Sequence, residues 1–164
     1  MKVLVFVKAT PNSEAGNMQG PDVQKMFEDM GKFNEALVKA GIMQEADGLK
    51  PSSFGKRIKF SGKHVSVFDG PFAETKELVA GYWVWNVKSM DEAIEWAKRC
   101  PNQMPGEEGV LEIRPTYSIE EFDSLLTDDM RKRDTRLRKE VARQQKAKSR
   151  PAVKRKPARA RSKK

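Results

Sequence analysis

The sequence predicts an α+β fold in which helices cover one face of a mostly antiparallel sheet. The expected elements follow in the order strand, helix, weak strand, hairpin, strand, helix, strand. Both expected helices before residue 101 carry a single apolar stripe, which is typical of a helix that packs on one side only. The third observation is that the excess of positive charge begins only after Met130, so the residues before it form the body of the protein.

A strand and a long helix are expected first. Residues 2–7 are β-branched or aromatic on both faces, which indicates a strand buried on both sides. A loop (9–21) with two glycines and two prolines precedes a helix that begins at Pro21 and ends near Gly41. The apolar residues of this helix recur at three- and four-residue steps and are predicted to face the core: Val23, Met26, Phe27, Met30, Phe33, Leu37 and Val38.

A weak strand (42–46) and a hairpin are predicted next. The hairpin joins residues 57–60 and 64–68 through Ser61-Gly62-Lys63. The turn chemistry of Asp69-Gly70-Pro71 follows it.

The strand at residues 78–87 is the strongest in the chain. One of its faces carries Trp83, Trp85 and Val87, and the other carries Tyr82 and Val84. If helices cover only one face of the sheet, the other face has no need to be aromatic. We therefore expect a second sheet to cover that face, supplied by an identical subunit in a homodimer.

The last helices of the body begin with capping boxes. Ser89 and Glu92 open a helix that stops at Pro101, with Met90, Ala93, Ile94 and Ala97 on its buried face. Residues 110–114 alternate as a final strand. Ser118 and Glu121 open a further helix whose apolar residues are expected to pack on the body: Ile119, Phe122, Leu125 and Leu126.

This order of elements predicts a ferredoxin-like sandwich. We expect a ferredoxin-like domain over residues 1–127, a basic helical extension over 128–148 and a disordered tail over 149–164, rich in Lys, Arg, Pro and Ala.

Charge divides the chain into two unlike parts. Of its 32 Lys and Arg residues 17 follow Met130, with only two acids, which leaves 15 basic and 21 acidic residues in the body. An acidic body with a basic arm favours binding of DNA or RNA phosphates over a merely solubilising extension. An anionic membrane is the weaker alternative, because the arm has no bulky apolar face. The expected nucleic-acid contacts are Arg131, Lys132, Arg133, Arg136, Arg138, Lys139, Arg143, Lys154, Arg155, Lys156, Arg159 and Arg161.

The chain has one cysteine, Cys100, and one histidine, His64. These exclude an intramolecular disulfide and a zinc site of Cys/His spacing, and we expect no metal and no cofactor. Residues 1–8 are too short an apolar run for a signal peptide or a membrane span, so we expect a cytoplasmic protein.

Asp69 is the candidate for acid or base catalysis. If Phe68 and Phe72 desolvate its carboxyl group, the pKa of that group rises towards the range useful for proton transfer. The alternative is that the carboxylate caps the turn that follows.

The residues from Asp69 to Glu77 also carry a resemblance. The chain resembles the DGPF-type members of the YCII-related (YciI-like) proteins from Met1 to about Phe122. The other markers are Lys8 with Ser13-Glu14-Ala15-Gly16, Asn34-Glu35, Gly48-Leu49-Lys50-Pro51-Ser52-Ser53, Gly81, Glu92-Ala93, Glu95-Trp96, Arg99-Cys100-Pro101 and Glu112-Ile113-Arg114-Pro115.

This resemblance implies a dimeric α+β barrel, in which two ferredoxin-like subunits pack their sheets face to face and each keeps a cleft. It implies no settled activity. Some relatives look like enzymes with a His–Asp dyad, but Asn34 stands where that histidine is expected. Genes of DGPF proteins often neighbour those of sigma factors, which implies an association with transcription.

A cleft of this kind suits a small anionic ligand. The cations Lys8, Arg57 and Lys76 could bind this anion, with Tyr82 or Trp83 stacking on it. Salt bridges to Glu74 and Glu77 explain the presence of the same cations equally well. The pocket candidates are Lys8, Asn34, Arg57, Asp69, Phe72, Lys76, Tyr82 and Trp83.

The sequence thus leads to two hypotheses. The first is a non-enzymatic, ligand-binding or regulatory dimer whose basic tail contacts nucleic acid. The second is a cofactor-free isomerase- or lyase-like enzyme that acts on a small anionic metabolite, with Asp69 transferring the proton.

Overall fold

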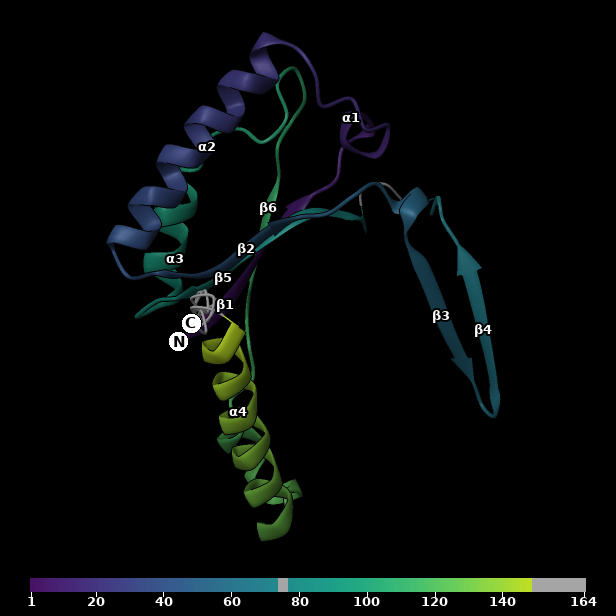
Figure 1. Ribbon diagram of the computed structural model, residues 1–164, viewed down its shortest axis with the longest axis vertical. Helices are drawn as coiled ribbons and strands as arrows, with labels where there is room; N and C mark the ends of the chain where they lie inside the picture. The colour runs from purple at the N-terminus through teal and green to yellow at the C-terminus, as the bar shows by residue number, and fades with distance from the viewer. Residues whose placement is uncertain (74–76, 149–164) are drawn as a thin grey trace, which may run out of the picture. The chain divides into compact units, whose positions relative to one another are not determined.

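The computed structural model describes residues 1–73 and 77–148 (Figure 1). It divides into two compact units, Met1–Thr116 and a second one that begins at Tyr117. Within the described residues, no helix is both long and apolar enough to cross a membrane.

The first unit is built on a four-stranded antiparallel sheet. Its strands are β1 (Lys2–Lys8), β2 (Met43–Gly48), β5 (Val79–Asn86) and β6 (Leu111–Pro115), in the spatial order β2-β5-β1-β6. The helices α2 (Pro21–Lys39) and α3 (Met90–Ala97) connect β1 to β2 and β5 to β6. Two strand–helix–strand units interleaved with β1 and β5 in the centre make a ferredoxin-like fold, so this prediction is confirmed.

One face of this sheet packs against both helices. Val3 and Val5 of β1 lie beside Trp83 and Trp85 of β5 in register, and all four are buried. Phe33 of α2 meets the two tryptophans edge-on, with ring centroids 6.2 and 6.3 Å apart. The rest of the core is Leu37, Ile42, Val87 and Ala93.

Helix α2 ends as the sequence predicts, with Gly41 at φ 73° after the C-cap Ala40. Its buried stripe is narrower than predicted, because only Met26, Phe33 and Leu37 are fully buried. Phe27 and Val38 are each 57% exposed, so their assignment to the core is wrong. They lie one position beyond buried residues, on the flanks of the stripe, where the sheet no longer reaches them.

Helix α3 begins at its predicted cap, and the Ser89 hydroxyl accepts a hydrogen bond from the Glu92 N–H. The Glu92 carboxylate reaches one residue further back than a capping box requires and accepts from the Lys88 N–H. Ala93 is fully buried, whereas Ile94 is exposed and does not belong to the packed face as predicted.

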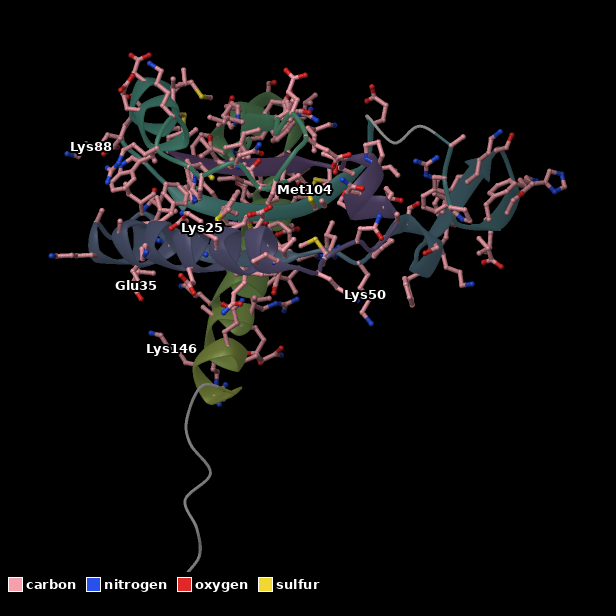
Figure 2. The ribbon with its side chains drawn as sticks, turned by 90° about the horizontal axis from the view of Figure 1, so that it is seen from above. Lys25, Glu35, Lys50, Lys88, Met104 and Lys146 are labelled. Carbon is pink, nitrogen blue, oxygen red and sulfur yellow. The ribbon has the colours of Figure 1, made fainter. Side chains whose placement is uncertain are left out.

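The predicted hairpin consists of β3 (Lys56–Ser61) and β4 (His64–Asp69), joined by Gly62 and Lys63. The two strands form a separate two-stranded sheet that stands away from the four-stranded one (Figure 1). Every residue of both strands is exposed. Figure 2 shows their side chains projecting outward on both faces.

The root of the hairpin is tightly built. The Glu14 carboxylate, at the end of α1 (Pro11–Glu14), accepts from the Ser52 N–H at 3.0 Å, and the Ser52 hydroxyl accepts from the Phe72 N–H at 3.1 Å. Ser52 opens the 3₁₀ helix η1 (Ser52–Phe54). A Cβ on Gly70 would lie 1.8 Å from the Ser52 carbonyl oxygen, so only glycine fits there. Residues 51–53 and 69–72 therefore pack closely against each other.

The second unit contains η3 (Glu120–Leu125) and α4 (Asp128–Lys148). The helix predicted from Ser118 and Glu121 is this short 3₁₀ turn, although Glu121 does accept a hydrogen bond from the Ser118 N–H. Leu125 is 75% exposed, and the predicted packing of this segment on the body stays a prediction. The predicted tail, 149–164, lies outside the described residues.

Candidate functional site

A cavity of about 240 Å³ lies between α2, the helix-covered face of the sheet and the loop that follows α3. The loop supplies Gln103 and Met104, and the segment before α2 supplies Met18. The complete lining is Val7, Met18, Met26, Phe27, Met30, Asn34, Ala46, Asp47, Gly48, Ala80, Gly81, Tyr82, Trp83, Gln103 and Met104. We call it the methionine cavity.

Four methionines from three segments give this cavity an adaptable apolar wall: Met18, Met26, Met30 and Met104. Unbranched thioether side chains rearrange at little cost and contact aromatic rings favourably. Gly81 keeps β2 and β5 close beside the cavity, since an added Cβ would lie only 3.1 Å from the Asp47 carbonyl oxygen. The wall therefore suits an apolar or aromatic ligand.

Two amide side chains supply its polar groups. Asn34 Oδ1 accepts a 2.9 Å hydrogen bond from Trp83 Nε1, which holds the indole in place. The Asn34 NH₂ group has no partner among the residues described. Gln103 donates to the Pro101 carbonyl oxygen and to Cys100 Sγ, and its Oε1 is buried with no donor in the described part of the chain. Asn34 thus keeps a donor available at the cavity wall, whereas Gln103 Oε1 is closed off beside Gly109.

No charged side chain faces the ligand space among these lining residues. Alternation along β2 and β5 directs Asp47 and Tyr82 to the opposite face of the sheet from Ala46 and Trp83. There the Tyr82 hydroxyl donates to Glu45 at 2.7 Å. This hydrogen bond, followed by burial and the charges of Glu45 and Asp47, raises the pKa of Tyr82.

The residues predicted to form one anion pocket lie in separate places. Asn34 and Trp83 form part of the methionine cavity, as does the main chain at Tyr82. Arg57 stacks on the Phe72 ring at 4.0 Å, in a shallow hollow at the hairpin root. Lys8 is paired with Glu112 at 3.5 Å in a third hollow, beside two more acids. The predicted convergence of Lys8 and Arg57 on one ligand is therefore corrected, and Lys76 lies outside the described residues.

Asp69 is not desolvated as predicted. Its side chain is 73% exposed and forms an ion pair with Lys56, its partner across the hairpin. Phe68 is itself half exposed, so it cannot remove water from the carboxylate. The carboxylate does not cap the following turn either, because the Phe72 N–H donates to Ser52 and the Gly70 N–H to Gly55.

Cys100 lies just beyond α3 and is partly buried against the core. Burial raises the pKa of its thiol to about 11, against a weaker lowering by the Gln103 hydrogen bond. A thiol with this pKa is a poor nucleophile at neutral pH.

Sequence reasoning missed the main lining of the cavity. It assigned Met26 and Met30 to the core, and it gave no role to Met18, Gln103 or Met104. The available signal was the number of methionines, eight in 164 residues, because an excess of Met is typical of adaptable binding surfaces.

Residues 1–120 match the family model of the YCII-related domain. The chain belongs to the YCII-related family. It is also 32% identical over 92 residues to an uncharacterised protein of Rhizobium meliloti (strain 1021), a match that covers 56% of this chain and 73% of that protein. The predicted family is thus confirmed, and the methionine cavity lies within the YCII-related domain.

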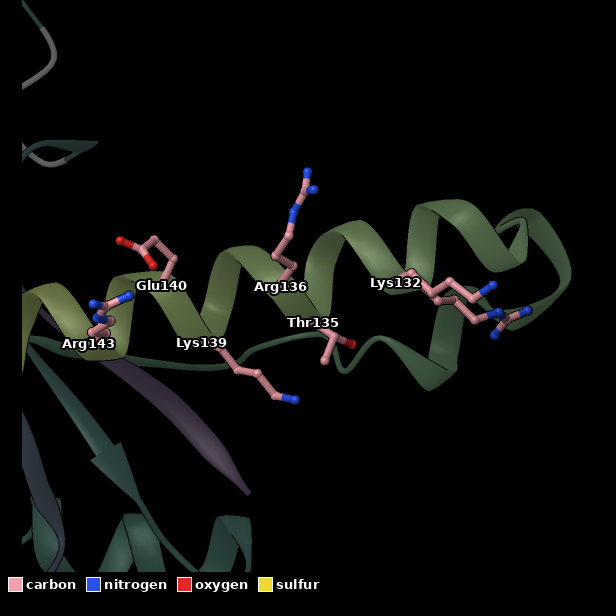
Figure 3. A pocket seen from close by; sticks show the side chains of 7 residues that line it. Lys132, Thr135, Arg136, Lys139, Glu140 and Arg143 are labelled. Atoms are coloured by element: carbon pink, nitrogen blue, oxygen red, sulfur yellow. The ribbon is translucent and has the colours of Figure 1, made fainter.

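The match ends at residue 120, and α4 begins after it, at Asp128. On α4, Lys132, Arg136, Lys139 and Arg143 recur at steps of four, three and four residues, which places them on one face. Figure 3 shows them along the helix. None of the four has an ion-pair partner in the described chain, whereas Arg138 is paired with Asp134 at 2.6 Å. We call these four residues the basic stripe. The candidates from Lys154 onward lie outside the described residues.

Proposed function

We propose that this YCII-related protein is a homodimer that binds a small, uncharged, largely apolar molecule in the methionine cavity. The observation that carries this proposal is the combination of an apolar wall with the Asn34 side chain, whose oxygen is held by Trp83 and whose NH₂ group is left to a ligand. Ligand pockets typically have this character, with a few polar groups that orient the ligand. The volume of about 240 Å³ suits a molecule of one or two rings.

The geometry favours binding over catalysis by Asp69. The carboxylate is exposed and paired with Lys56, and it does not line the methionine cavity. A general base needs reach to a bound substrate, and the position of Asp69 does not provide it. An uncharged ligand also replaces the anion expected from the sequence, because Lys8 and Arg57 lie elsewhere.

The open face of the sheet supports the dimer. Leu4 and Phe6 of β1 lie beside Val84 and Tyr82 of β5 in register, on the face opposite the helices. All four are only partly buried in the single chain. A contiguous apolar patch in the centre of a sheet is typical of a protein interface, and a two-fold axis would cover it on both copies.

Three indole compounds test the ligand proposal: indole, tryptamine and indole-3-acetate. We expect neutral indole to raise the melting temperature most and the anion indole-3-acetate least. Met30→Trp, which fills the cavity, should abolish the shift, and Asn34→Leu should reduce it. Val38→Ala, on an exposed part of α2, is the matched control. Stabilisation by the anion alone, unchanged in Met30→Trp, would overturn the proposal.

A second function is favoured by the basic stripe. We propose that α4 and the tail contact the phosphates of DNA or RNA without reading the sequence. Four unpaired cations on one helix face can follow a nucleic-acid backbone, whereas cations already paired, such as Arg138, contribute less.

Duplex DNA binding at several salt concentrations tests this second function. We expect full-length affinity to fall steeply with salt, and a chain that ends at Asp129 to lose binding. A variant with Gln at all four residues of the basic stripe should show a shallower slope of log affinity against log salt. The expected change in slope corresponds to the loss of up to about four phosphate contacts. A second variant with Gln at Lys154, Arg155, Lys156 and Arg159 loses the same charge and separates the helix from the tail. Equal binding by full-length and truncated chains would refute nucleic-acid contact by this region.

A further inference from the structure

The β3–β4 hairpin is a two-stranded sheet that no other described residue covers. Within the described residues its strands pair only with each other, and all their residues are exposed. Isolated two-stranded hairpins are marginally stable in water and usually need a third strand or a packing partner. The hairpin of this chain therefore lacks the contact that would stabilise it.

The missing contact belongs on one particular face. The register sets Ile58 opposite Val67 and Phe60 opposite Val65, so these four side chains share one side of the ribbon. Their exposed fractions run from 58% for Ile58 to 74% for Phe60. The other side is more polar, with Lys59 opposite Ser66 and Arg57 opposite Phe68.

The hairpin is anchored rather than loosely tethered. Gly70 packs directly beneath the Ser52 carbonyl, and the Phe72 N–H donates to the Ser52 hydroxyl. The Arg57 guanidinium stacks on Phe72 at the same root. A rooted ribbon presents its apolar face in a defined direction, which lowers the entropic cost of docking it on a partner.

The second copy of this chain is the occupant that the structure favours. The hairpin leaves the sheet after β2 and returns to it before β5, the adjacent strands that carry Glu45, Asp47 and Tyr82 on the open face. A subunit seated on that face is within reach of the hairpin. Two-fold symmetry would then place each hairpin against its partner.

Charge favours the same occupant. The hairpin (56–69) carries four cations and one acid. The open face of the sheet carries the acids Glu45 and Asp47 on the edge strand β2, whereas Glu112 on the other edge is paired with Lys8 and Arg114. The acidic border is therefore the β2 edge, and it is complementary to a hairpin with a net positive charge.

We propose that the β3–β4 hairpin is a dimerisation arm whose face of Ile58, Phe60, Val65 and Val67 docks on a second copy of this chain, beside the acidic border of its open sheet. This inference rests on the proposed dimer. It adds the arm, which makes the exposed hairpin a part of the assembly rather than a free appendage.

Sedimentation equilibrium with a matched pair of variants tests the arm. The arm variant is Phe60→Ser with Val65→Ser. The control is Tyr117→Ser with Val38→Ser, which removes apolar residues of similar exposure, 74% and 57%, from outside the hairpin. We expect the dimer Kd to rise by roughly 10-fold or more in the arm variant and to change less than about 2-fold in the control.

Zero-length cross-linking of the wild-type protein provides a test that needs no mutation. Dimers mixed from ¹⁴N- and ¹⁵N-labelled chains should yield cross-links from Lys59 or Lys63 of one copy to Glu45 or Asp47 of the other. A wild-type protein that is monomeric at all concentrations overturns both the dimer and the arm. A stable dimer with unchanged Kd in the arm variant and no such cross-link overturns the arm alone.

Discussion

The strand β5 and the hairpin β3–β4 have similar sequences and opposite surroundings. Both are rich in β-branched and aromatic residues, which occupy both faces of β5 and mainly one face of the hairpin. In β5, Trp85 is fully buried and Trp83 is 5% exposed, whereas Phe60 at the hairpin tip is 74% exposed. The difference comes from α2 and α3, which cover β5 and do not reach the hairpin. These residue types therefore predict a strand, but the sequence of the strand does not show which element covers its apolar face.

This contrast explains why strand β5 and the β3–β4 hairpin take different roles in the proposed function. Burial between helices and sheet gives β5 a rigid position, which orients Trp83 and Asn34 at the methionine cavity. An uncovered ribbon keeps its apolar side chains available to a partner. Substitutions in the two regions should consequently differ in what they affect: the stability of the single chain in one, and the assembly in the other.

Trp85→Ala gives the largest expected effect. Removing a fully buried indole from the aromatic cluster should lower the free energy of unfolding by about 3–5 kcal/mol. Phe60→Ala should lower it by less than about 0.5 kcal/mol at protein concentrations where the chain is monomeric. Urea denaturation measures both. Equal losses would mean that the hairpin tip is covered within one chain.

Gly70→Ala should also destabilise strongly, by about 2–4 kcal/mol. Its Cβ would overlap the Ser52 carbonyl oxygen, and this oxygen is main chain and cannot turn aside. The matched control is Gly31→Ala, inside α2 with no atom within 4 Å of the added Cβ. The control should gain about 0.5–1 kcal/mol from helix propensity. A neutral Gly70→Ala would show that the hairpin root moves freely.

For Cys100, beside the buried core, we expect a smaller effect, which is a pH-dependent change in the free energy of unfolding. Its thiol binds a proton more tightly in the folded chain, where the pKa is about 11, than in the unfolded chain, where it is near 9.0. This contribution to stability is complete below pH 9 and is lost as the pH rises to 11. Because the thiol is only partly buried, we expect a loss of about 1 kcal/mol or less.

Thermal unfolding at pH 8 and pH 10.5, compared with Cys100→Ala, isolates this loss from that of other groups. Alkylation by iodoacetamide at pH 8 should run on the order of 100-fold slower than for a free cysteine, because little thiolate is present. A rate like that of the free amino acid would contradict the burial of the thiol.

Asp69→Asn has the smallest expected effect. The ion pair with Lys56 is exposed on both sides, so its loss should change the free energy of unfolding by less than about 0.5 kcal/mol. Binding of indole should be unchanged, since Asp69 does not line the methionine cavity. A loss of indole binding in this variant would show that Asp69 contributes to the ligand site. The hairpin would then not be separate in function from the methionine cavity.

Local patterns predicted much of the fold. The boundaries of α2 follow from Pro21 and Gly41, and the start of α3 follows from Ser89 and Glu92. The hairpin turn at Gly62 is equally visible in the sequence. These features depend on residues within a few positions of one another, so neighbouring side chains and φ angles decide them.

The candidate site could be predicted only in part. Asn34 and Trp83 were found through the family resemblance and the aromatic strand, and they do meet. Lys8 and Arg57 were placed with them because the sequence shows only that they are basic. Lys8 faces Glu112 across the β1–β6 pair, and Arg57 lies on the separate hairpin.

The sequence by itself determined the family, the antiparallel α+β plan, the turn at Asp-Gly-Pro and the separation of a basic helix from an acidic body. The tertiary structure decided which side chains converge. Met18, Met30 and Met104 lie far apart along the chain, and only the packing of α2 on the sheet brings them to one cavity. Helical and strand periodicity acts over a few residues, whereas a cavity depends on the path of the whole chain, and its lining therefore cannot be read from any single segment.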